Sequence, residues 1–268
     1  MDHVEGPDDP RVTDYLNLRD PEASRRGEVF VVEGRVALER VIDGGLDVRS
    51  VLLTPPRAEQ LADLLDRMGP STPVLVADRS VLAATAGFDV HRGILAIAAR
   101  PGPLPVQELL QRGDRWLVTE ATTDHENLGS LFRNAAGLGF QGVLADSRTA
   151  DPYYRRCVRV SLGWSAVLPH ARLATLADDL PALREAGVRS VALCPHRGRP
   201  VDEAVAAGSL DGPTALVVGS EGPGLDEATI EACDEAVSIP MAGSADSLNV
   251  ATAFAVVASF DAARRNWR

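Results

Sequence analysis

Residues 214–224, Thr-Ala-Leu-Val-Val-Gly-Ser-Glu-Gly-Pro-Gly, join an apolar strand to a glycine-rich loop. Glycines after a strand let a ligand come close to the backbone, because no side chain blocks the approach. Loops of this kind often hold a nucleotide phosphate at the start of the next helix. Glu221 argues against that use, since a carboxylate would repel a phosphate. The loop therefore favours a ligand with cationic or hydroxyl groups.

The glycines of this loop do not match the common nucleotide-binding patterns. Gly219, Gly222 and Gly224 fit neither GxGxxG nor GxxxxGK[ST], and the lysine of a triphosphate site is absent. A tight turn without a ligand is the alternative when the loop is taken alone.

Short apolar strands alternate with helices along the rest of the chain, which predicts an α/β fold. Strands are expected at residues 29–32, 50–53, 73–77, 94–98, 116–119, 142–145, 188–193, 215–218 and 237–239. Helices are expected at residues 35–42, 57–68, 80–86, 128–138, 153–162, 201–207, 226–232 and 248–265. The apolar strands of the second half are typical of a parallel sheet covered on both faces. Ligands of such sheets bind beyond the carboxyl ends of the strands, so the loops after Thr119 and Val218 are expected at the binding edge.

A proline-rich segment, Arg100-Pro-Gly-Pro-Leu-Pro105, separates the two halves. Prolines at this density favour an extended linker. We therefore divide the chain into an extension (1–27), a first α/β domain (28–100), a linker (101–112) and a second α/β domain (113–268).

Composition excludes several classes of protein. No apolar run approaches the ~18 residues that a membrane span requires, and the acidic N-terminus lacks a signal sequence. The expected location is the cytoplasm. Three scattered cysteines, Cys157, Cys194 and Cys233, predict neither a disulfide framework nor a metal site, and Cys194 with His196 cannot close a zinc shell.

The net charge of −11 disfavours a polyanionic partner, although binding depends on local patches. Basic residues gather at Arg25 and Arg26 and between Arg148 and Arg159. Solvated surface is the alternative for each cluster.

A second informative block is Asp124-His-Glu-Asn-Leu-Gly-Ser-Leu-Phe-Arg-Asn-Ala-Ala-Gly-Leu-Gly139. Asn127 is expected to cap the helix that follows. Gly129, Arg133 and Gly137 share one helix face. Each glycine costs a helix about 1 kcal/mol relative to alanine, so we infer that they provide clearance for another backbone or a substrate to reach Arg133. A surface arginine is the alternative.

A third block is Ile239-Pro-Met-Ala-Gly-Ser-Ala-Asp-Ser-Leu-Asn-Val-Ala-Thr-Ala253. It combines a short strand, a polar loop and a helix start, which Ser247 can cap. Asn249 is expected in the first turn of that helix, facing the loop region.

Together, the three blocks resemble the motifs of the SpoU-type (TrmH-like) RNA 2′-O-ribose methyltransferases of the SPOUT superfamily. Residues 127–135 are similar to the first motif, residues 217–225 to the second, and Ile239-Pro-Met with Ser247-Leu-Asn-Val-Ala251 to the third. The resemblance covers residues 112–265. Residues 28–99 more loosely resemble the ribosomal-protein-like RNA-binding domain that often precedes it, including Val90-His-Arg-Gly-Ile-Leu-Ala96.

The resemblance implies a trefoil-knotted α/β domain that works as a homodimer and binds S-adenosyl-L-methionine in the knot. Pattern rules alone would not propose a knot, because knotted chains are rare. The implied cofactor contacts are Gly219, Ile239, Leu248, Leu193, Val218 and Met241. The cationic sulfonium and ammonium groups of this cofactor agree with the absence of a basic phosphate cradle.

The resemblance also implies that Asn127, Arg133, Glu221 and Asn249 form the active site for methylation of a ribose 2′-hydroxyl. A hydroxyl is a poor nucleophile until its proton is taken or its oxygen polarised. Arg133 is the implied activator, but arginine stays protonated in proteins. A role in orienting the 2′-oxygen and the neighbouring phosphate is therefore an equal alternative to general base. Whether Glu221 contacts the cofactor, the loop or the RNA stays open here.

The implied substrate is RNA, with rRNA favoured over tRNA because the leading domain is ribosomal-protein-like. Arg25, Arg26, Arg155 and Arg156 are the expected RNA contacts, and no membrane partner is expected. Ala251 departs from the serine that many relatives carry, although Thr252 or Ser247 could supply a hydroxyl. A non-catalytic RNA-binding relative is the second hypothesis, and a nucleotide-dependent oxidoreductase the third, disfavoured by the missing GxGxxG.

Overall fold

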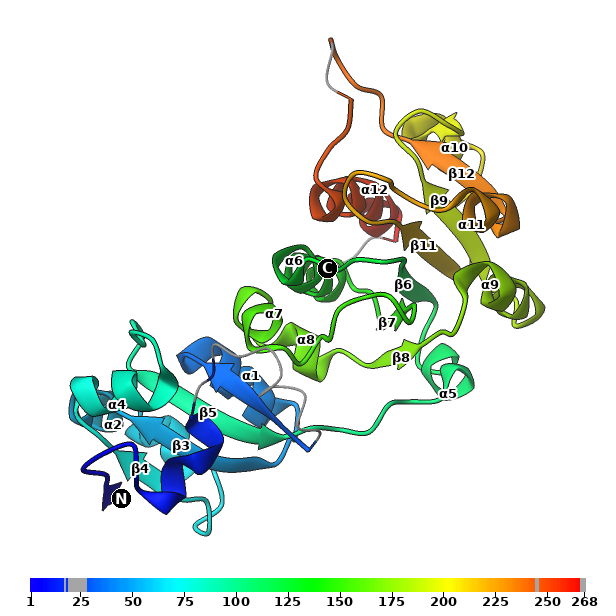
Figure 1. Cartoon of the computed structure of the whole chain (residues 1–268). Helices are drawn as coiled ribbons and strands as arrows, with labels where there is room; N and C mark the ends of the chain where they lie inside the picture. Colours follow the sequence, from blue (N-terminus) through cyan, green and yellow to red (C-terminus); the bar gives the residue numbers. More distant parts are fainter. Residues whose placement is uncertain (17, 19–27, 244–245, 266–268) are drawn as a thin grey trace. The chain divides into compact units, whose positions relative to one another are not determined.

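The computed structural model describes residues 1–16, 18, 28–243 and 246–265. The chain forms two compact units, drawn in Figure 1. Unit 1 consists of Met1–Gly102 with Asp151–Val167, and unit 2 of Pro103–Ala150 with Leu168–Arg268.

Unit 1 contains a mixed five-stranded sheet in the order β1-β4-β3-β5-β2. Its strands are β1 (Asp2–His3), β2 (Val29–Glu33), β3 (Val48–Leu53), β4 (Val74–Val76) and β5 (Ile94–Ala99). Strand β5 runs antiparallel to both of its neighbours, β2 and β3. The helices are η1 (Pro10–Tyr15), α1 (Arg35–Asp43), α2 (Pro55–Gln60), α3 (Ala62–Asp66), α4 (Arg79–Ala86), α7 (Arg155–Val160) and α8 (Trp164–Val167).

The limits of unit 1 differ from the expected domain limits in two places. Residues expected as a loose extension contribute β1 and buried side chains, among them Tyr15, whose hydroxyl lies 2.7 Å from the Ser50 hydroxyl. In addition, α7 and α8 were expected in the second domain, yet Val158 and Ala166 pack in the core of unit 1. A strand and helix alternation predicts element types, but it does not show which core an element joins.

Unit 2 is built on seven strands in the order β10-β12-β9-β11-β6-β7-β8. The strands are β6 (Arg115–Thr119), β7 (Gly142–Ala145), β8 (His170–Arg172), β9 (Arg189–Leu193), β10 (Arg199–Pro200), β11 (Thr214–Val218) and β12 (Glu235–Ser238). Every recorded pairing between them is parallel, which confirms the predicted parallel sheet. Val218 pairs with Thr119, so the two informative loops do leave the sheet at the same edge.

Helices cover both faces of this sheet (Figure 1). One face carries α6 (His125–Gly137) and α12 (Val250–Arg264), which pack on each other, with α10 (Val201–Ala206) beside α12. The other face carries α5 (Val106–Leu110), α9 (Leu176–Glu185) and α11 (Glu227–Ala232), whose apolar side chains share one core with the strands. No element was predicted between residues 163 and 187, where α8, β8 and α9 lie. Pro181 lies inside α9, and a proline is normally a sign of a helix end.

A buried ion pair fixes α12 against the sheet. The Arg115 guanidinium donates to both carboxylate oxygens of Asp261 at 2.9 Å, and both side chains are buried. Arg115 also donates to the carbonyl oxygens of Leu210 and Gly212. Because this ion pair holds α12 in place, it also helps to fix the first residue of α12, which lies at the carboxyl edge of the sheet.

Candidate active site

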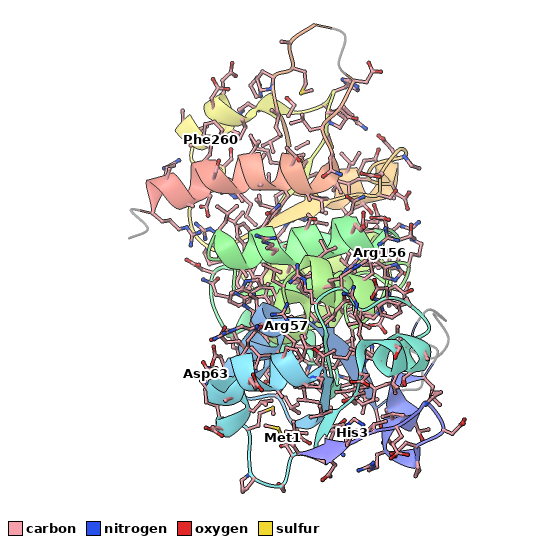
Figure 2. All side chains as sticks on the ribbon, turned by 90° about the vertical axis from the view of Figure 1, so that its left-hand side faces the viewer. Met1, His3, Arg57, Asp63, Arg156 and Phe260 are labelled. Atoms are coloured by element: carbon pink, nitrogen blue, oxygen red, sulfur yellow. The ribbon has the colours of Figure 1, made fainter. Side chains whose placement is uncertain are left out.

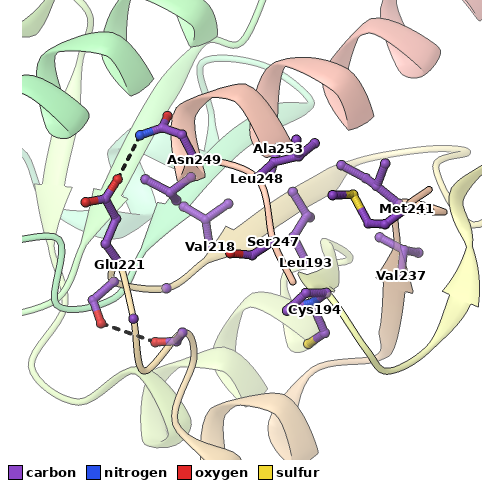
Figure 3. A pocket seen from close by; sticks show the side chains of 17 residues that line it. Leu193, Cys194, Val218, Glu221, Val237, Met241, Ser247, Leu248, Asn249 and Ala253 are labelled. Atoms are coloured by element: carbon purple, nitrogen blue, oxygen red, sulfur yellow. Dashed lines mark hydrogen bonds between the residues drawn. The ribbon is translucent and has the colours of Figure 1, made fainter. Parts of the chain in front are cut away.

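A cavity of about 460 Å³ lies beyond the carboxyl ends of β9, β11 and β12, at the start of α12 (Figure 3). All six residues that were expected to contact a cofactor line this cavity: Leu193, Val218, Gly219, Ile239, Met241 and Leu248. The cavity is also lined by residues that were not predicted as cofactor contacts, namely Cys194, Pro195, Val237, Ser247 and Ala253. They come from the segment after β9, from β12, and from α12 and the segment before it, so only the packing of these elements identifies them.

The glycine-rich loop is a closed turn that forms one wall of the cavity. Ser220 and Gly224 exchange two backbone hydrogen bonds of 3.2 and 3.1 Å. A Cβ atom on Gly219 would lie 2.1 Å from the carbonyl carbon of Gly224. Gly219 is therefore required by the closure of the loop itself, in addition to lining the cavity. Gly222 and Gly224 have φ angles of 87° and 78°, which favour glycine.

Asn249 joins three segments of the chain. Its Oδ1 accepts hydrogen bonds from the N–H groups of Ala251 and Thr252, and so caps α12. Its Nδ2 donates to Oδ1 of Asn127 and to Oε1 of Glu221, both at 2.8 Å. The bond to Glu221 is drawn in Figure 3. Because the cap needs an acceptor, the amide orientation follows from the hydrogen bonds.

Two expected helix caps are wrong. Asp124 caps α6 by accepting from the N–H groups of Glu126 and Asn127, which leaves the Asn127 side chain inside the first turn. Asn249, rather than Ser247, caps α12. In both cases, a second short polar residue near the helix start has the required extended backbone.

Arg133 is exposed on α6, and no hydrogen bond or ion pair ties it to another part of the chain that the structure describes. It follows Asn127 by six positions, which places the two side chains about 120° apart around the helix. It does not line the cavity. A Cβ atom on Gly137 would meet open space, so nothing within the described chain requires this glycine.

Ala251 is buried at the contact between α6 and α12, and its carbonyl oxygen accepts a hydrogen bond of 2.9 Å from Nδ2 of Asn134. It does not line the cavity, whereas Ser247 does. The absence of a hydroxyl at position 251 therefore removes no polar group from the cavity wall.

A buried carboxylate, Glu120, anchors the chain that follows the glycine loop. It accepts hydrogen bonds from the N–H of Asp226 at 2.8 Å and from the Thr229 hydroxyl at 2.6 Å. Arg148 bridges Glu120 and Asp146. Sequence analysis missed this network, although an acid directly after an apolar strand at the binding edge was a usable sign.

Asp146 supports the neighbouring loop after β6. Burial by itself raises the pKa of its carboxyl group, but hydrogen bonds from Thr149, the N–H of Ala121 and Arg148 outweigh burial and lower the pKa below 3.8. Ala121 has a φ of 48°, rare for a residue with a side chain. The Asp146 carboxylate therefore holds a strained turn next to α6.

The expected RNA-contact arginines have different environments. Arg25 and Arg26 lie outside the described residues. Arg155 is largely buried, forms a 2.7 Å ion pair with Glu33 and lies over the Phe88 ring, so it has a structural role within unit 1. Arg156 is exposed on α7 (Figure 2). The internal pairing of Arg148 and Arg155 reduces the basic surplus that the sequence suggested.

Within the described residues, no three His, Cys, Asp or Glu side chains are grouped as a metal site would require. Burial raises the pKa of the Cys194 thiol at the cavity wall. None of the helices formed by the described residues has the length and apolar character needed to cross a membrane.

The sequence profile described as the SpoU rRNA Methylase family matches residues 114–259. An uncharacterized tRNA/rRNA methyltransferase of Mycobacterium tuberculosis is 39% identical over 93% of this chain and 88% of its own length. A 23S rRNA (guanosine-2′-O-)-methyltransferase of Burkholderia is 33% identical over 72% of this chain and 77% of its own.

Two solved structures have the same architecture over nearly the whole chain. The AdoMet-bound rRNA methyltransferase from Sinorhizobium meliloti has a TM-score of 0.81 at 25% identity, covering 99% of this chain and 98% of that one. The SpoU methyltransferase AviRb from Streptomyces viridochromogenes, in complex with AdoMet, has a TM-score of 0.79 at 28% identity, covering 96% and 98%.

Proposed function

The chain belongs to the SpoU rRNA Methylase family, and we propose that it transfers the methyl group of S-adenosylmethionine to a ribose 2′-hydroxyl of RNA. This family is the one that the three sequence motifs resembled. The observation that carries the proposal is the hydrogen-bonded group of Asn127, Glu221 and Asn249 at the mouth of the cavity. Each of the three residues comes from a different motif.

The cavity fits this cofactor chemically. Its wall combines apolar side chains from β9, β11 and β12 with backbone groups of the glycine loop, and among the described residues that line it there is no lysine or arginine. A cationic ligand without phosphates meets no repulsion there. Leu193, Val218, Gly219, Ile239, Met241 and Leu248 hold the cofactor, which when bound supplies an electrophilic methyl group. Two structural neighbours have AdoMet bound.

The chain's own residues position the reacting hydroxyl. Asn249 fixes the Glu221 carboxylate through Oε1 and leaves Oε2 for a hydroxyl of the RNA or the cofactor. The same amide fixes Asn127, so three polar side chains have set orientations before any ligand arrives. Arg133 stays protonated and orients the 2′-oxygen and a neighbouring phosphate through its planar guanidinium.

Unit 1 is the RNA substrate-binding domain, and rRNA is favoured over tRNA as the substrate. A relative of this chain is named a 23S rRNA methyltransferase, and a structural neighbour an rRNA methyltransferase. An enzyme acting on rRNA works in the cytoplasm, where ribosomes are assembled. A nucleotide in a single-stranded loop is the expected target, since splayed nucleotides expose the ribose.

Unit 2 is a trefoil-knotted domain that works as a homodimer. Support for the knot comes from the match of residues 114–259 to the family whose motifs implied it, and from the start of α12, where Leu248 and Asn249 line the same cavity as the glycine loop. Support for the dimer comes from α12, on which the large apolar side chain of Phe260 is exposed (Figure 2). An exposed apolar helix face commonly marks a protein interface.

The test is direct. The protein is incubated with methyl-labelled S-adenosylmethionine and with total rRNA or tRNA, and the 2′-O-methyl positions are mapped. We expect label in one rRNA nucleotide. Cofactor binding without transfer to any RNA would contradict the proposal and favour a non-catalytic relative.

A further inference from the structure

Besides the cavity of unit 2, the structure has a cavity of about 120 Å³ in unit 1. No residue of the three motifs lines it. It lies at the starts of α1 and α2 and at the residues before β5. Three of its six lining residues are arginines, Arg35, Arg57 and Arg92, and the others are Val36, Leu61 and Ile94. These arginines come from three separate segments, so their grouping is a product of the fold.

The position of Arg35 at a helix start is electrostatically unfavourable without an anion. Arg35 is the first residue of α1, and Arg57, on the six-residue helix α2, lines the same cavity. The N-cap of α1 is Gly34, which offers no side-chain acceptor to the first N–H groups of the helix. Helix starts carry partial positive charge and favour anions. Three guanidinium groups beside such a helix start repel one another and the helix dipole.

Arg92 is held over this helix start by the shape of the backbone. A Cβ atom on Gly34 would lie 2.8 Å from Cδ of Arg92, so a residue with a side chain at position 34 would displace the arginine. The φ of Gly34, 94°, also favours glycine. Among the residues that the structure describes, no acceptor pairs with the Arg92 guanidinium, which leaves its five N–H donors available.

The neighbouring acceptors neutralise only part of the charge. Arg35 pairs with the exposed Asp63 at 3.2 Å. Arg57 donates to the uncharged Gln60 side chain at 2.7 Å. Figure 2 labels Arg57 and Asp63 on α2 and α3. The group therefore keeps two positive charges without a carboxylate partner, in a chain whose net charge is −11.

We propose that the Arg35–Arg57–Arg92 cavity binds one phosphate group of the RNA backbone. A phosphate presents several acceptor oxygens to the guanidinium donors, and arginine matches phosphate geometry. Phosphate contacts fix the register of a nucleic acid on a protein without reading its sequence. The assignment of the phosphate to RNA rests on the proposed function, in which unit 1 binds the substrate RNA.

The experiment compares the double variant Arg57→Gln/Arg92→Gln with the wild type in the full chain. Arg35 is left in place because it pairs with Asp63. Binding of a short fluorescein-labelled RNA stem-loop is measured by anisotropy at several salt concentrations. We expect the affinity to fall by about tenfold or more, as for lost charge-assisted hydrogen bonds. The slope of log affinity against log salt should become shallower by about 0.7 to 0.9, equivalent to one phosphate.

The matched control is Arg49→Gln, an exposed arginine at the opposite end of β3 whose partner is Asp47. Equal RNA affinity and salt slope in the double variant and this control would overturn the proposal. Inorganic phosphate is titrated as a second probe. If it binds the wild type but not the double variant while RNA affinity is unchanged, the cavity takes a free phosphate and the RNA assignment is wrong.

Folding and the proposed function are monitored separately. Thermal unfolding and S-adenosylmethionine affinity should match the wild type in both variants, because the cavity of unit 2 is untouched. Absence of methyl transfer by the wild type would contradict the proposed function alone. A loss of RNA affinity specific to the double variant would still support the phosphate cavity in that case.

Discussion

At the scale of single residues, the candidate site depends on Asn249, whose side-chain amide forms hydrogen bonds through both its oxygen and its nitrogen. Asn249 accepts two hydrogen bonds at Oδ1 and donates two at Nδ2. Its role as a helix cap and its proposed role in the active site are therefore carried by different atoms of the side chain. A substitution can separate the two roles.

Asn249→Asp should keep the cap of α12 and lose the hydrogen bonds to Asn127 and Glu221. Aspartate caps helices as well as asparagine does, but a carboxylate cannot donate to Asn127 and would repel Glu221. We expect nearly unchanged helix content and methyl transfer reduced by about a hundredfold or more, the usual cost of removing a positioned donor. Circular dichroism and a labelled-methyl assay measure the two effects. Asn249→Ala, which loses both roles, is the comparison, and wild-type transfer by Asn249→Asp would refute the role of Nδ2.

Arg133→Ala should remove methyl transfer and leave cofactor affinity nearly unchanged, because Arg133 does not line the cavity. Transfer should fall by about a hundredfold or more if the guanidinium orients the reacting groups. Calorimetry with S-adenosylmethionine and a transfer assay check the split. Arg133→Lys keeps the charge without the planar fork and should recover only part of the activity. Parallel loss of cofactor binding would mean that Arg133 is structural.

At the scale of elements, the site is formed by loops that close on themselves and on each other. The glycine loop is closed by Ser220 and Gly224, and the segment after it is anchored by Glu120. The turn after β6 is held by Asp146. The contacts of Glu120 and Asp146 therefore come from residues outside the three motifs.

Gly219→Ala should open the glycine loop, because the added Cβ would overlap the Gly224 backbone. Overpacking of this kind costs about 1–3 kcal/mol, which corresponds to a loss of cofactor affinity of about tenfold or more. Calorimetry measures this affinity. Gly137→Ala, where the Cβ meets open space, is the control and should bind the cofactor like the wild type. Equal affinities in the two variants would show that loop closure does not shape the cavity.

Asp146 should make stability depend on pH in the acid range. Its folded-state pKa is lowered, so its contribution is complete above the unfolded value and is lost as the pH falls through the folded value. Asp146→Asn should therefore reduce stability at neutral pH by about 1–3 kcal/mol and lose less on acidification. Urea unfolding at about pH 7 and about pH 3 tests this. Asp66→Asn removes an exposed carboxylate of unit 1 as a control, and an unchanged acid loss in Asp146→Asn would contradict the assignment.

At the scale of the whole molecule, the two units differ in how they relate to the organisation predicted from the sequence. Unit 2 follows the predicted alternation and carries all three motifs. Unit 1 recruits residues from the start of the chain and from the middle of the second half, Asp151–Val167. The proposed homodimer is a further level of organisation, because it requires a second copy of the chain.

Phe260→Asp should shift the protein from dimer to monomer, because a charge on the exposed face of α12 would be buried without a partner in the proposed interface. Sedimentation velocity measures the change. Val36→Asp is the matched control, since Val36 is also an exposed apolar residue but lies on α1 of unit 1. A wild-type protein that sediments as a monomer would contradict the dimer proposal, and a dimeric Phe260→Asp variant would exclude this face as its interface.

Prediction from sequence succeeded where the signal is local. The apolar strands and the shared edge of Thr119 and Val218 agree with the structure, and residues of the second and third motifs line the cavity. It failed at the caps of α6 and α12, where neighbouring polar residues compete and backbone angles decide. It also missed α9, because Pro181 obscured the helix, and the structural pairing of Arg155.

The sequence by itself determined the α/β class and the family resemblance, and it predicted the site residues, because motif spacing and apolar periodicity are local properties of the chain. Only the tertiary structure decided how the Gly219–Gly224 loop is used. Its glycine closes the turn, and its glutamate accepts from Asn249, 28 residues further along, which in turn reaches Asn127 across 122 residues. Hydrogen bonds between such distant residues depend on how the strand ends pack, and no local pattern encodes that packing.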